Sequence, residues 1–288
     1  MWYSEAWKDY ELIEASDGER LERWGKYNIV RPDPQVIWIK ERHSDLWNRA
    51  DAKYIRSNKG GGEWAVKNVP ETWEINYRDL RFMVKPMNFK HMGIFPEQAS
   101  NWDFIMETIR NSGRSVRVLN LFAYTGAATI AAASAGASVC HIDSSKGVVG
   151  MAKKNAALSG LSDAPIRYIV DDCKKFVMRE IRRGNTYDAI IMDPPSYGRG
   201  PNGEVWKIEE CIDEFLTMAS MLLSKNPLFF LLSSYTGGMS PNAIKYLAEL
   251  RIMKYRYGKV ESDELGIPMR SQNGVLPAGA SLRIKFDF

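Results

Sequence analysis

From residue 116 onward, short apolar runs alternate with segments of helical periodicity. The apolar runs are VRVLNLF, SVCHID, IRYIV, YDAIIMD and LFFLLSS. Helical patterns follow them, among them the alanine-rich GAATIAAASAG and the long segment EVWKIEECIDEFLTMASMLLS. Apolar strands that alternate with helices predict a parallel sheet with both faces covered. The last runs, YRYGKV and SLRIKFDF, have no helix between them and predict a hairpin that ends the sheet.

The first hundred residues differ from this pattern. Eight of the nine tryptophans precede residue 103. Short aromatic and β-branched runs, YNIV, QVIWI, WEINY and LRFMV, predict strands, and RPDP and NKGGGE predict turns between them. A helix is expected over residues 98–111, with Pro96 near its first turn. We therefore expect a β-rich region at residues 1–97 and an α/β domain at residues 98–288.

The composition sets broad limits. The chain has 39 Lys and Arg against 35 Asp and Glu, and its net charge of +4 permits a nucleic-acid partner without requiring one. No apolar run approaches the roughly 18 residues of a membrane span, and the first residues lack the features of a secretory signal. The cysteines number three and have no metal-ligand spacing. We expect a cytoplasmic protein with no metal site and no membrane partner.

Acidic residues are found where the predicted strands end. In sheets of this type, ligands bind outside the carboxyl ends of the strands. Asp143 ends the second strand and lies 17 residues after Gly126, a spacing that suits hydrogen bonding to ribose hydroxyls. Asp143 could instead cap the next helix. An acid after the third strand, Asp171 or Asp172, would suit an adenine amino group.

Missing motifs narrow the choice of cofactor. The turn FAYTGAATI has one glycine, so the dinucleotide fingerprint G-x-G-x-x-G is absent, and the P-loop pattern is absent too. A pyrophosphate ligand is therefore disfavoured. S-adenosyl-L-methionine has a ribose and an adenine but no phosphate, and it requires one glycine for close approach. We expect it as the cofactor.

A second motif, IIMDPPSYGRG, covers residues 190–200. Asp193 would end the fourth strand. That strand would lie beside the first, so Asp193 would face the same crevice as the end of the first strand. The two prolines cannot continue a strand, and they fix the backbone beyond the acid and remove two amide donors. Such a strand end could hold a target base or amine near a methyl donor. The simpler alternative is a turn that only terminates the strand.

Together these motifs resemble those of a known family. VLNLFAYTGAATIAAASAGA, HIDSSKGVVGMAKKNAALSG, VDDCKKF and DPPSYGRG are similar to successive motifs of class I S-adenosylmethionine-dependent methyltransferases. The F-x-Y-T-G turn and D-P-P-S are most similar to large-subunit ribosomal RNA methyltransferases that modify cytosine C5 or guanine N7. HMGIFPEQASNW resembles the segment before that fold. The resemblance covers roughly residues 80–235 and implies a Rossmann-like sheet of seven strands with an antiparallel last hairpin.

The resemblance also implies roles for individual residues. Asp143, with Ser144 beside it, would hold the ribose hydroxyls. Asp172, with Cys173 next to it, would meet the adenine, and Gln98 would close over the cofactor. The residues implied at the first strand end and the methionine side are Asn120, Phe122, Ala123, Tyr124, Thr125 and Gly126. Those implied to face the methyl group and the acceptor are Asp193, Pro194, Pro195 and Ser196.

The sequence departs from the family in two places. Cytosine-C5 transfer needs a cysteine thiolate, which in the resembling enzymes follows the fifth strand, whereas this chain has Ser233 and Ser234 there. Direct transfer to a nitrogen or oxygen atom needs no such nucleophile. The N-terminal region does not match the family's RNA-binding barrel, although its basic and aromatic residues could contact RNA: Arg31, Lys40, Arg42, Trp47, Arg49, Lys53, Arg56 and Lys59. In the alternative, its tryptophans are core and its charges face solvent.

We therefore expect an S-adenosylmethionine-dependent methyltransferase that modifies a base in ribosomal or other structured RNA by direct transfer. Two alternatives stay open: a methyltransferase acting on a small molecule or a protein side chain, and a catalytically silent RNA-binding module. The sequence does not choose between a monomer and a homodimer.

Overall fold

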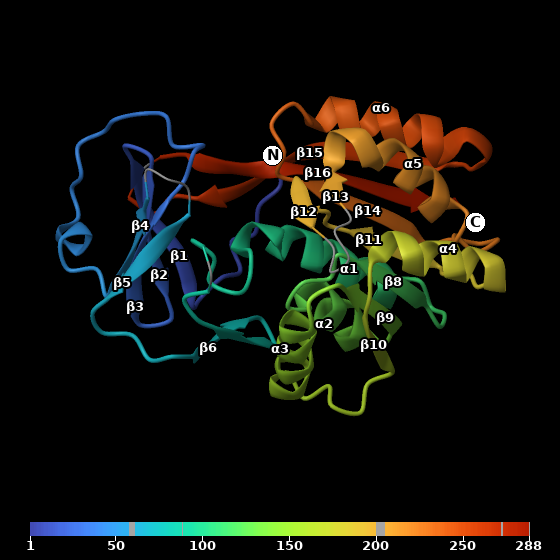
Figure 1. The fold of residues 1–288 in the computed structure, drawn as a ribbon, viewed down its shortest axis with the longest axis horizontal. Helices are drawn as coiled ribbons and strands as arrows, with labels where there is room; N and C mark the ends of the chain where they lie inside the picture. Colours follow the sequence, from blue (N-terminus) through green and yellow to red (C-terminus); the bar gives the residue numbers. More distant parts are fainter. Residues whose placement is uncertain (58–60, 88, 200–204, 272, 288) are drawn as a thin grey trace. The chain divides into compact units, whose positions relative to one another are not determined.

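The computed structural model describes residues 1–57, 61–87, 89–199, 205–271 and 273–287 (Figure 1). Lys59 and Gly200, which belong to motifs singled out above, lie outside these residues. The chain divides into two compact units. The sheet unit comprises Met1, Asn101–Glu264 and Gly279–Phe288, and the N-terminal unit comprises Trp2–Ser100 and Leu265–Ala278. The tip of the last hairpin thus groups with the N-terminal unit, which the expected boundary at residues 97 and 98 did not anticipate.

The sheet unit is built on a seven-stranded sheet with the order β10-β9-β8-β11-β14-β16-β15. Its strands are β8 (Arg117–Leu121), β9 (Ser138–Asp143), β10 (Ile166–Val170), β11 (Ala189–Met192), β14 (Phe229–Ser234), β15 (Gly258–Pro268) and β16 (Val275–Phe286). The five strands from β10 to β14 are parallel, and β16 is antiparallel to β14. This arrangement confirms the predicted parallel sheet that ends in an antiparallel hairpin.

Helices cover both faces of this sheet (Figure 1). They are α1 (Ala99–Asn111), α2 (Ala127–Ser134) and α3 (Lys146–Leu158) on one side, and α4 (Cys173–Arg183), α5 (Ile208–Ser220) and α6 (Pro241–Arg251) on the other. The main core of this unit joins the second set of helices to the strands. Phe176, Phe215 and Ile244 from α4, α5 and α6 are each at most 1% exposed and pack with Leu121 and Met192. Burying such side chains stabilises the unit by about 2 kcal/mol each, so the strand ends are held on a rigid frame.

One predicted helix begins later than expected. The segment from residue 204 was expected to be helical, but β13 (Val205–Lys207) comes first and pairs with β12 (Tyr197–Arg199). Val205 and Trp206 favour strand over helix because β-branched and aromatic side chains lose rotamer freedom in a helix. The ribbon therefore continues directly from the D-P-P-S motif.

The N-terminal unit contains a five-stranded sheet whose strands follow sequence order. They are β1 (Tyr10–Ser16), β2 (Glu19–Trp24), β3 (Tyr27–Pro32), β4 (Ala52–Arg56) and β5 (Gly62–Val66), and β6 (Trp73–Tyr77) pairs with β7 (Leu80–Val84) as a separate ribbon. The segment QVIWI, expected as a strand, is irregular. The Asp33 side chain accepts a hydrogen bond from the Gln35 amide at 3.0 Å, and this local turn next to Pro32 and Pro34 replaces a strand ladder.

Two residues expected to contact RNA are instead interior. Arg31 is 2% exposed and donates to Glu22 at 2.6 and 2.8 Å. Trp47 is 9% exposed, packs in a core cluster, and donates its indole N–H to Glu14 at 2.6 Å. Burial removes both side chains from an RNA surface, so the expectation for these residues is corrected.

Candidate active site at the carboxyl ends of the strands

Strand register brings the predicted site residues into one row. Leu121, the last residue of β8, pairs with Ile142 of β9 and with Met192 of β11. The next residues are Asp143 on β9 and Asp193 after β11, one on each side of β8. Because neighbouring strands lie about 4.8 Å apart, these two strand ends are about 10 Å apart. That separation suits a ligand that extends from a ribose to a reacting group.

The loop after β8 has an unusual backbone. Phe122 and Tyr124 have φ values of 55° and 49°, in the left-handed region that non-glycine residues rarely adopt. Hydrogen bonds hold this conformation: the Ala123 amide donates to the Ile142 carbonyl at 3.0 Å, and Asn155 donates to the Thr125 carbonyl at 3.0 Å. Backbone strain of this kind costs about 1–3 kcal/mol and gathers at functional sites.

Gly126 ends this loop and begins α2. Its φ of 86° favours glycine, and a Cβ placed on it would lie 2.8 Å from the Cβ of Ala152 in α3. The sequence suggested that this glycine allows the close approach of a cofactor. The structure adds a second reason, which is the close packing of the α2 start on α3.

Asp143 is held by backbone amides. Its carboxylate accepts the Tyr124 N–H and the Ser145 N–H, each at 2.9 Å. Burial raises the pKa of Asp143, and the N–H donors of Ser145, Tyr124 and Ser144 oppose that rise. A carboxylate offers about four acceptor positions, so capacity is left for a ribose hydroxyl. The cap of α3 is Ser145, whose hydroxyl accepts the Val148 N–H, so Asp143 is not the cap residue. Ser144 is exposed beside it.

The third strand end supplies Asp172 and Cys173. Asp172 is the N-cap of α4 and accepts the Lys175 amide at 2.8 Å through one oxygen. The Cys173 thiol is buried and accepts the Phe122 amide at 3.3 Å, and burial raises its pKa. Cys173 therefore supports the β8 loop as a neutral thiol. The neighbouring Asp171 forms an ion pair with Arg179.

Asn120 lies beneath the loop. It is 2% exposed and donates to Thr129 at 2.9 Å, and Thr129 lies 2.9 Å from Nδ1 of His141. Burial lowers the pKa of His141 to about 4, so the ring is neutral in this network. The side chain of Asn120 thus positions β8 and α2. Gln98 is buried in the short helix η2 (Pro96–Gln98) and belongs to the N-terminal unit.

The D-P-P-S turn is fixed by two contacts that sequence inspection missed. Trp206 of β13 donates its indole N–H to the Pro195 carbonyl at 2.6 Å. The Ser196 hydroxyl lies 2.6 Å from the hydroxyl of Thr236. The Trp206 ring also packs 5.1 Å from the Phe122 ring, which links the turn to the β8 loop. The Pro195 carbonyl is therefore already hydrogen-bonded. The partners lie 11 and 40 residues further along the chain, at no fixed spacing that a sequence motif describes.

The charges at these strand ends favour a cationic ligand. Asp143, Asp172 and Asp193 follow three strands of the same sheet, and Asp193 is partly buried. Carboxylates at such a crevice repel phosphate and attract a positive group such as a sulfonium. The residues present therefore fit S-adenosylmethionine. Among the described residues, no group of His, Cys, Asp and Glu side chains could hold a metal ion.

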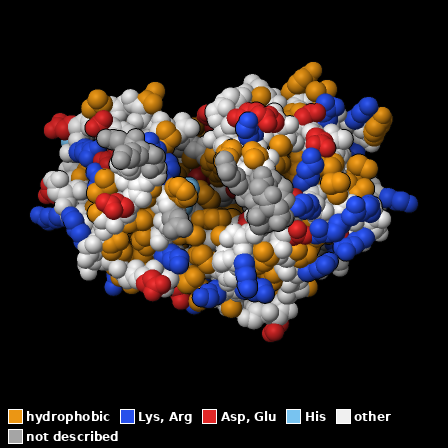
Figure 2. Space-filling model, viewed as in Figure 1, with side chains coloured by type: hydrophobic (Ala, Val, Ile, Leu, Met, Phe, Trp, Pro, Cys, Tyr) orange, Lys and Arg blue, Asp and Glu red, His pale blue; other side chains and the backbone are white. Residues whose placement is uncertain are grey.

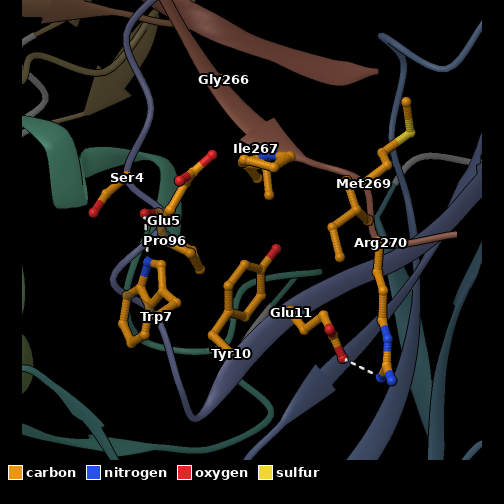
Figure 3. Close-up of a pocket in the computed structure, with 12 residues that line it drawn as sticks. Ser4, Glu5, Trp7, Tyr10, Glu11, Pro96, Gly266, Ile267, Met269 and Arg270 are labelled. Atoms are coloured by element: carbon orange, nitrogen blue, oxygen red, sulfur yellow. Dashed lines mark hydrogen bonds and ion pairs between the residues drawn. The ribbon is translucent and has the colours of Figure 1, made fainter. Parts of the chain in front are cut away.

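The N-terminal unit has a cavity of its own, about 240 Å³ in volume (Figure 3). Trp7 and Tyr10 form an aromatic wall, and the Trp7 indole N–H donates to the Pro96 carbonyl at 3.1 Å. Arg270, from the hairpin tip, pairs with Glu11 at 3.0 Å on another side. The cavity is thus lined mainly by the chain start and the hairpin tip. No helix in the described part of the chain is long and apolar enough to cross a membrane.

The sheet order and the row of strand-end carboxylates define a Rossmann-like protein that binds a nucleoside-containing, cationic cofactor. Comparison with known proteins identifies the family. The model of the S-adenosylmethionine-dependent methyltransferase family matches residues 21–223, and the chain belongs to this family. Its cofactor is S-adenosyl-L-methionine.

Solved structures agree with this assignment. A SAM-dependent methyltransferase from Agrobacterium tumefaciens is 36% identical, with a TM-score of 0.92 over 98% of this chain and 92% of that one. A candidate SAM-dependent methyltransferase from Streptococcus mutans shares the fold, with 20% identity and a TM-score of 0.74 over 98% of this chain and 76% of that one.

Curated relatives match a shorter stretch. The ribosomal RNA large subunit methyltransferase K/L of Shewanella frigidimarina is 37% identical over 120 residues, which are 41% of this chain and 17% of that protein. The protein of the same name from Alteromonas mediterranea is 29% identical over 198 residues, 67% of this chain and 26% of that protein. The chain thus matches about a quarter or less of the length of these relatives.

Proposed function

We propose that this protein transfers a methyl group from S-adenosylmethionine to a base of ribosomal or other structured RNA, by direct transfer. The observation that carries the proposal is the pair of strand-end acids, Asp143 and Asp193, on the two sides of the β8 loop. The names of the curated relatives and the net charge of +4 support RNA as the acceptor.

In this proposal each acid has a separate task. Asp143 accepts hydrogen bonds from the ribose hydroxyls. Asp172 accepts a hydrogen bond from the adenine amino group through its second oxygen. The cofactor supplies an electrophilic methyl group on a positively charged sulfur. Asp193 accepts a hydrogen bond from an N–H of the target base and so orients the base nitrogen in line with that methyl group. Pro194, Pro195 and Ser196 keep this strand end rigid, and alignment of this kind lowers the barrier without a covalent intermediate.

The two buried cysteines support direct transfer rather than cytosine-C5 chemistry. Cys173 is buried with a raised pKa, and burial raises the pKa of Cys140 to about 11. A thiol with a raised pKa is a poor nucleophile at neutral pH because the thiolate is the reactive form. Ser233 and Ser234, which stand where the family's cysteine is expected, are at most 1% exposed inside β14.

We further propose that the N-terminal region, residues 1–97, contacts the RNA. Lys40, Arg49 and Arg56 are exposed there. Arg42 and Lys53 each pair with Glu19, at 3.0 and 2.7 Å, which lowers the charge that they can offer to phosphate. Lys40, Arg49 and Arg56 are therefore the basic side chains of this region that we assign to RNA.

The test is transfer of a radiolabelled methyl group from S-adenosylmethionine into an extract of cells that lack the protein. The extract is fractionated into RNA, protein and small molecules. We expect label in ribosomal RNA, mapped to one base by nuclease digestion, and no label with the Asp193→Ala variant. Label in protein or small molecules would overturn the RNA acceptor and leave the cofactor assignment in place.

A further inference from the structure

The turn between α6 and β15 presents two tyrosines to solvent. Tyr255 and Tyr257 are each 83% exposed. Large aromatic side chains that remain exposed on a folded surface are typical of interaction sites, because burial of a ring is strongly favourable. The tyrosines lie in the sequence KYRYGK, residues 254–259, in which basic and aromatic residues alternate.

The backbone of this turn is anchored at its centre. Arg256, between the two tyrosines, donates to the carbonyls of Ser220 and Leu223 at 3.2 and 3.4 Å. The Tyr257 carbonyl accepts the Asp287 amide at 3.1 Å. These bonds attach the turn to the end of α5 and to the end of the chain. The two rings are thus held outward on a fixed backbone, which lowers the entropy lost on binding.

Beside the turn lies a cavity of about 380 Å³ between the C-terminal ends of α5 and α6. Met221 and Leu250, which are 59% and 44% exposed, supply its apolar lining, and Tyr255 stands at its edge. Figure 2 shows hydrophobic and basic side chains next to one another over these helices, at the upper right. A flat aromatic group such as a base can enter a cavity of this size.

The local charge is positive. Residues 245–259 contain Lys245, Arg251, Lys254, Arg256 and Lys259 against the single acid Glu249. Lys254 lies 5.2 Å from the centre of the Tyr255 ring. Arg251 is neutralised by Asp213 at 2.6 Å and Lys259 by Glu261 at 2.8 Å, so Lys254 is the exposed cation that we assign to this site. Exposed aromatic rings beside a cation can bind single-stranded nucleic acid, through base stacking and a phosphate contact.

We propose that residues 254–259 and the adjoining cavity form a stacking site for unpaired bases of the RNA. This inference rests on the proposed function. The site lies at the amino-terminal end of β14, since Ser220 and Leu223 precede that strand. The active site lies at the carboxyl end, about 20 Å away along a strand of six residues. The site therefore holds a flanking segment of the RNA and does not touch the reacting base.

The test compares the Tyr255→Ala/Tyr257→Ala double variant with the Tyr255→Phe/Tyr257→Phe double variant. The probe is a fluorescent single-stranded RNA of mixed sequence, titrated by anisotropy. Because stacking contributes about 1–3 kcal/mol per base, we expect the alanine variant to bind about tenfold or more weakly. The phenylalanine variant, which keeps both rings, should bind as the wild type does. Equal affinity of the alanine variant and the wild type, or equal weakening of both variants, would overturn the stacking site.

Steady-state methylation separates this inference from the proposed function. With a structured RNA acceptor that has single-stranded flanks, the alanine variant should raise KM about tenfold and leave kcat unchanged, because the rings lie far from the methyl group. Trimming the flanks should abolish this difference. RNA methylation by the wild type with an unchanged KM in the variant would overturn the stacking site alone. Label that enters no RNA would overturn the proposed function, while the anisotropy titration would still decide the stacking site.

Discussion

Two carboxylates in this protein, Glu22 of the N-terminal unit and Asp143 of the sheet unit, show how surroundings assign a role to an acid. Glu22 is fully buried and is met by side chains: Tyr10 donates to it at 2.7 Å and Arg31 donates twice. Asp143 is met by backbone N–H groups at a strand end. Glu22 is 0% exposed and out of reach of a ligand, whereas Asp143 is partly exposed at a strand end and can accept a hydrogen bond from one.

The comparison extends to pKa. Burial alone would raise the pKa of Glu22, but Arg20 and Arg31 outweigh it and lower the pKa to about 2. At Asp143 burial is the larger effect, and the pKa is raised. The neighbouring arginine side chains thus keep Glu22 ionised in the interior of the N-terminal unit. Asp143 has no such cation in its described contacts, so the sulfonium cofactor is a favourable counter-charge for it.

The largest expected effect concerns Asp193, the second acid of the proposed active site. Asp193→Ala should lower kcat by a factor of about 10²–10⁴, because the N–H of the target base loses the carboxylate to which it donates. Cofactor affinity, measured by calorimetry, should stay unchanged. Asp163→Ala, an exposed acid before β10, is the matched control and should keep full activity. Full turnover in the Asp193 variant would remove the D-P-P-S turn from the active site.

Glu22→Ala should destabilise the protein by about 3–5 kcal/mol, because it leaves Arg31 buried without its acid and Arg20 with Asp33 alone. Chemical denaturation measures the loss, and Lys53→Ala, which breaks the exposed pair with Glu19, should cost under about 1 kcal/mol. The lowered pKa of Glu22 contributes stability above its ordinary value of about 4.5, and this contribution is lost as pH falls toward 2. If the Glu22→Ala variant is as stable as the wild type at pH 7, the charge of Glu22 does not stabilise the fold.

Asp143→Asn should have the smallest effect, a rise in the Kd for S-adenosylmethionine of about 10- to 100-fold. The change removes a charged acceptor and places an amide N–H against the Tyr124 or Ser145 N–H, at a cost of about 1.5–3 kcal/mol. Calorimetry measures this Kd, and the Asp163→Asn variant is the control. If affinity is unchanged, Asp143 does not hold the ribose, and the contrast with Glu22 fails.

Much of the fold followed from local sequence. The runs SVCHID and IRYIV form β9 and β10 at the predicted residues, because continuous apolar runs between helical patterns suit a buried parallel sheet. The errors came where turns and neighbours compete with propensity. QVIWI is rich in β-formers but follows Pro34 and the Asp33 turn. The strands β1 and β2 were not predicted, because they contain the buried acids Glu14 and Glu22 and a carboxylate is normally expected to be exposed.

The sequence by itself determined the parallel sheet, the strand-end acids Asp143, Asp172 and Asp193, and the type of cofactor, since these depend on periodicity and on residues at fixed offsets from strands. Only the tertiary structure decided that Trp206 and Thr236 fix the D-P-P-S turn, that Asn120 joins a buried network with Thr129 and His141, and that Arg31 neutralises Glu22. These contacts join residues that lie 9 to 40 positions apart, in different strands, helices and loops, and hydrogen bonds and ion pairs depend on distances that the folded chain alone sets.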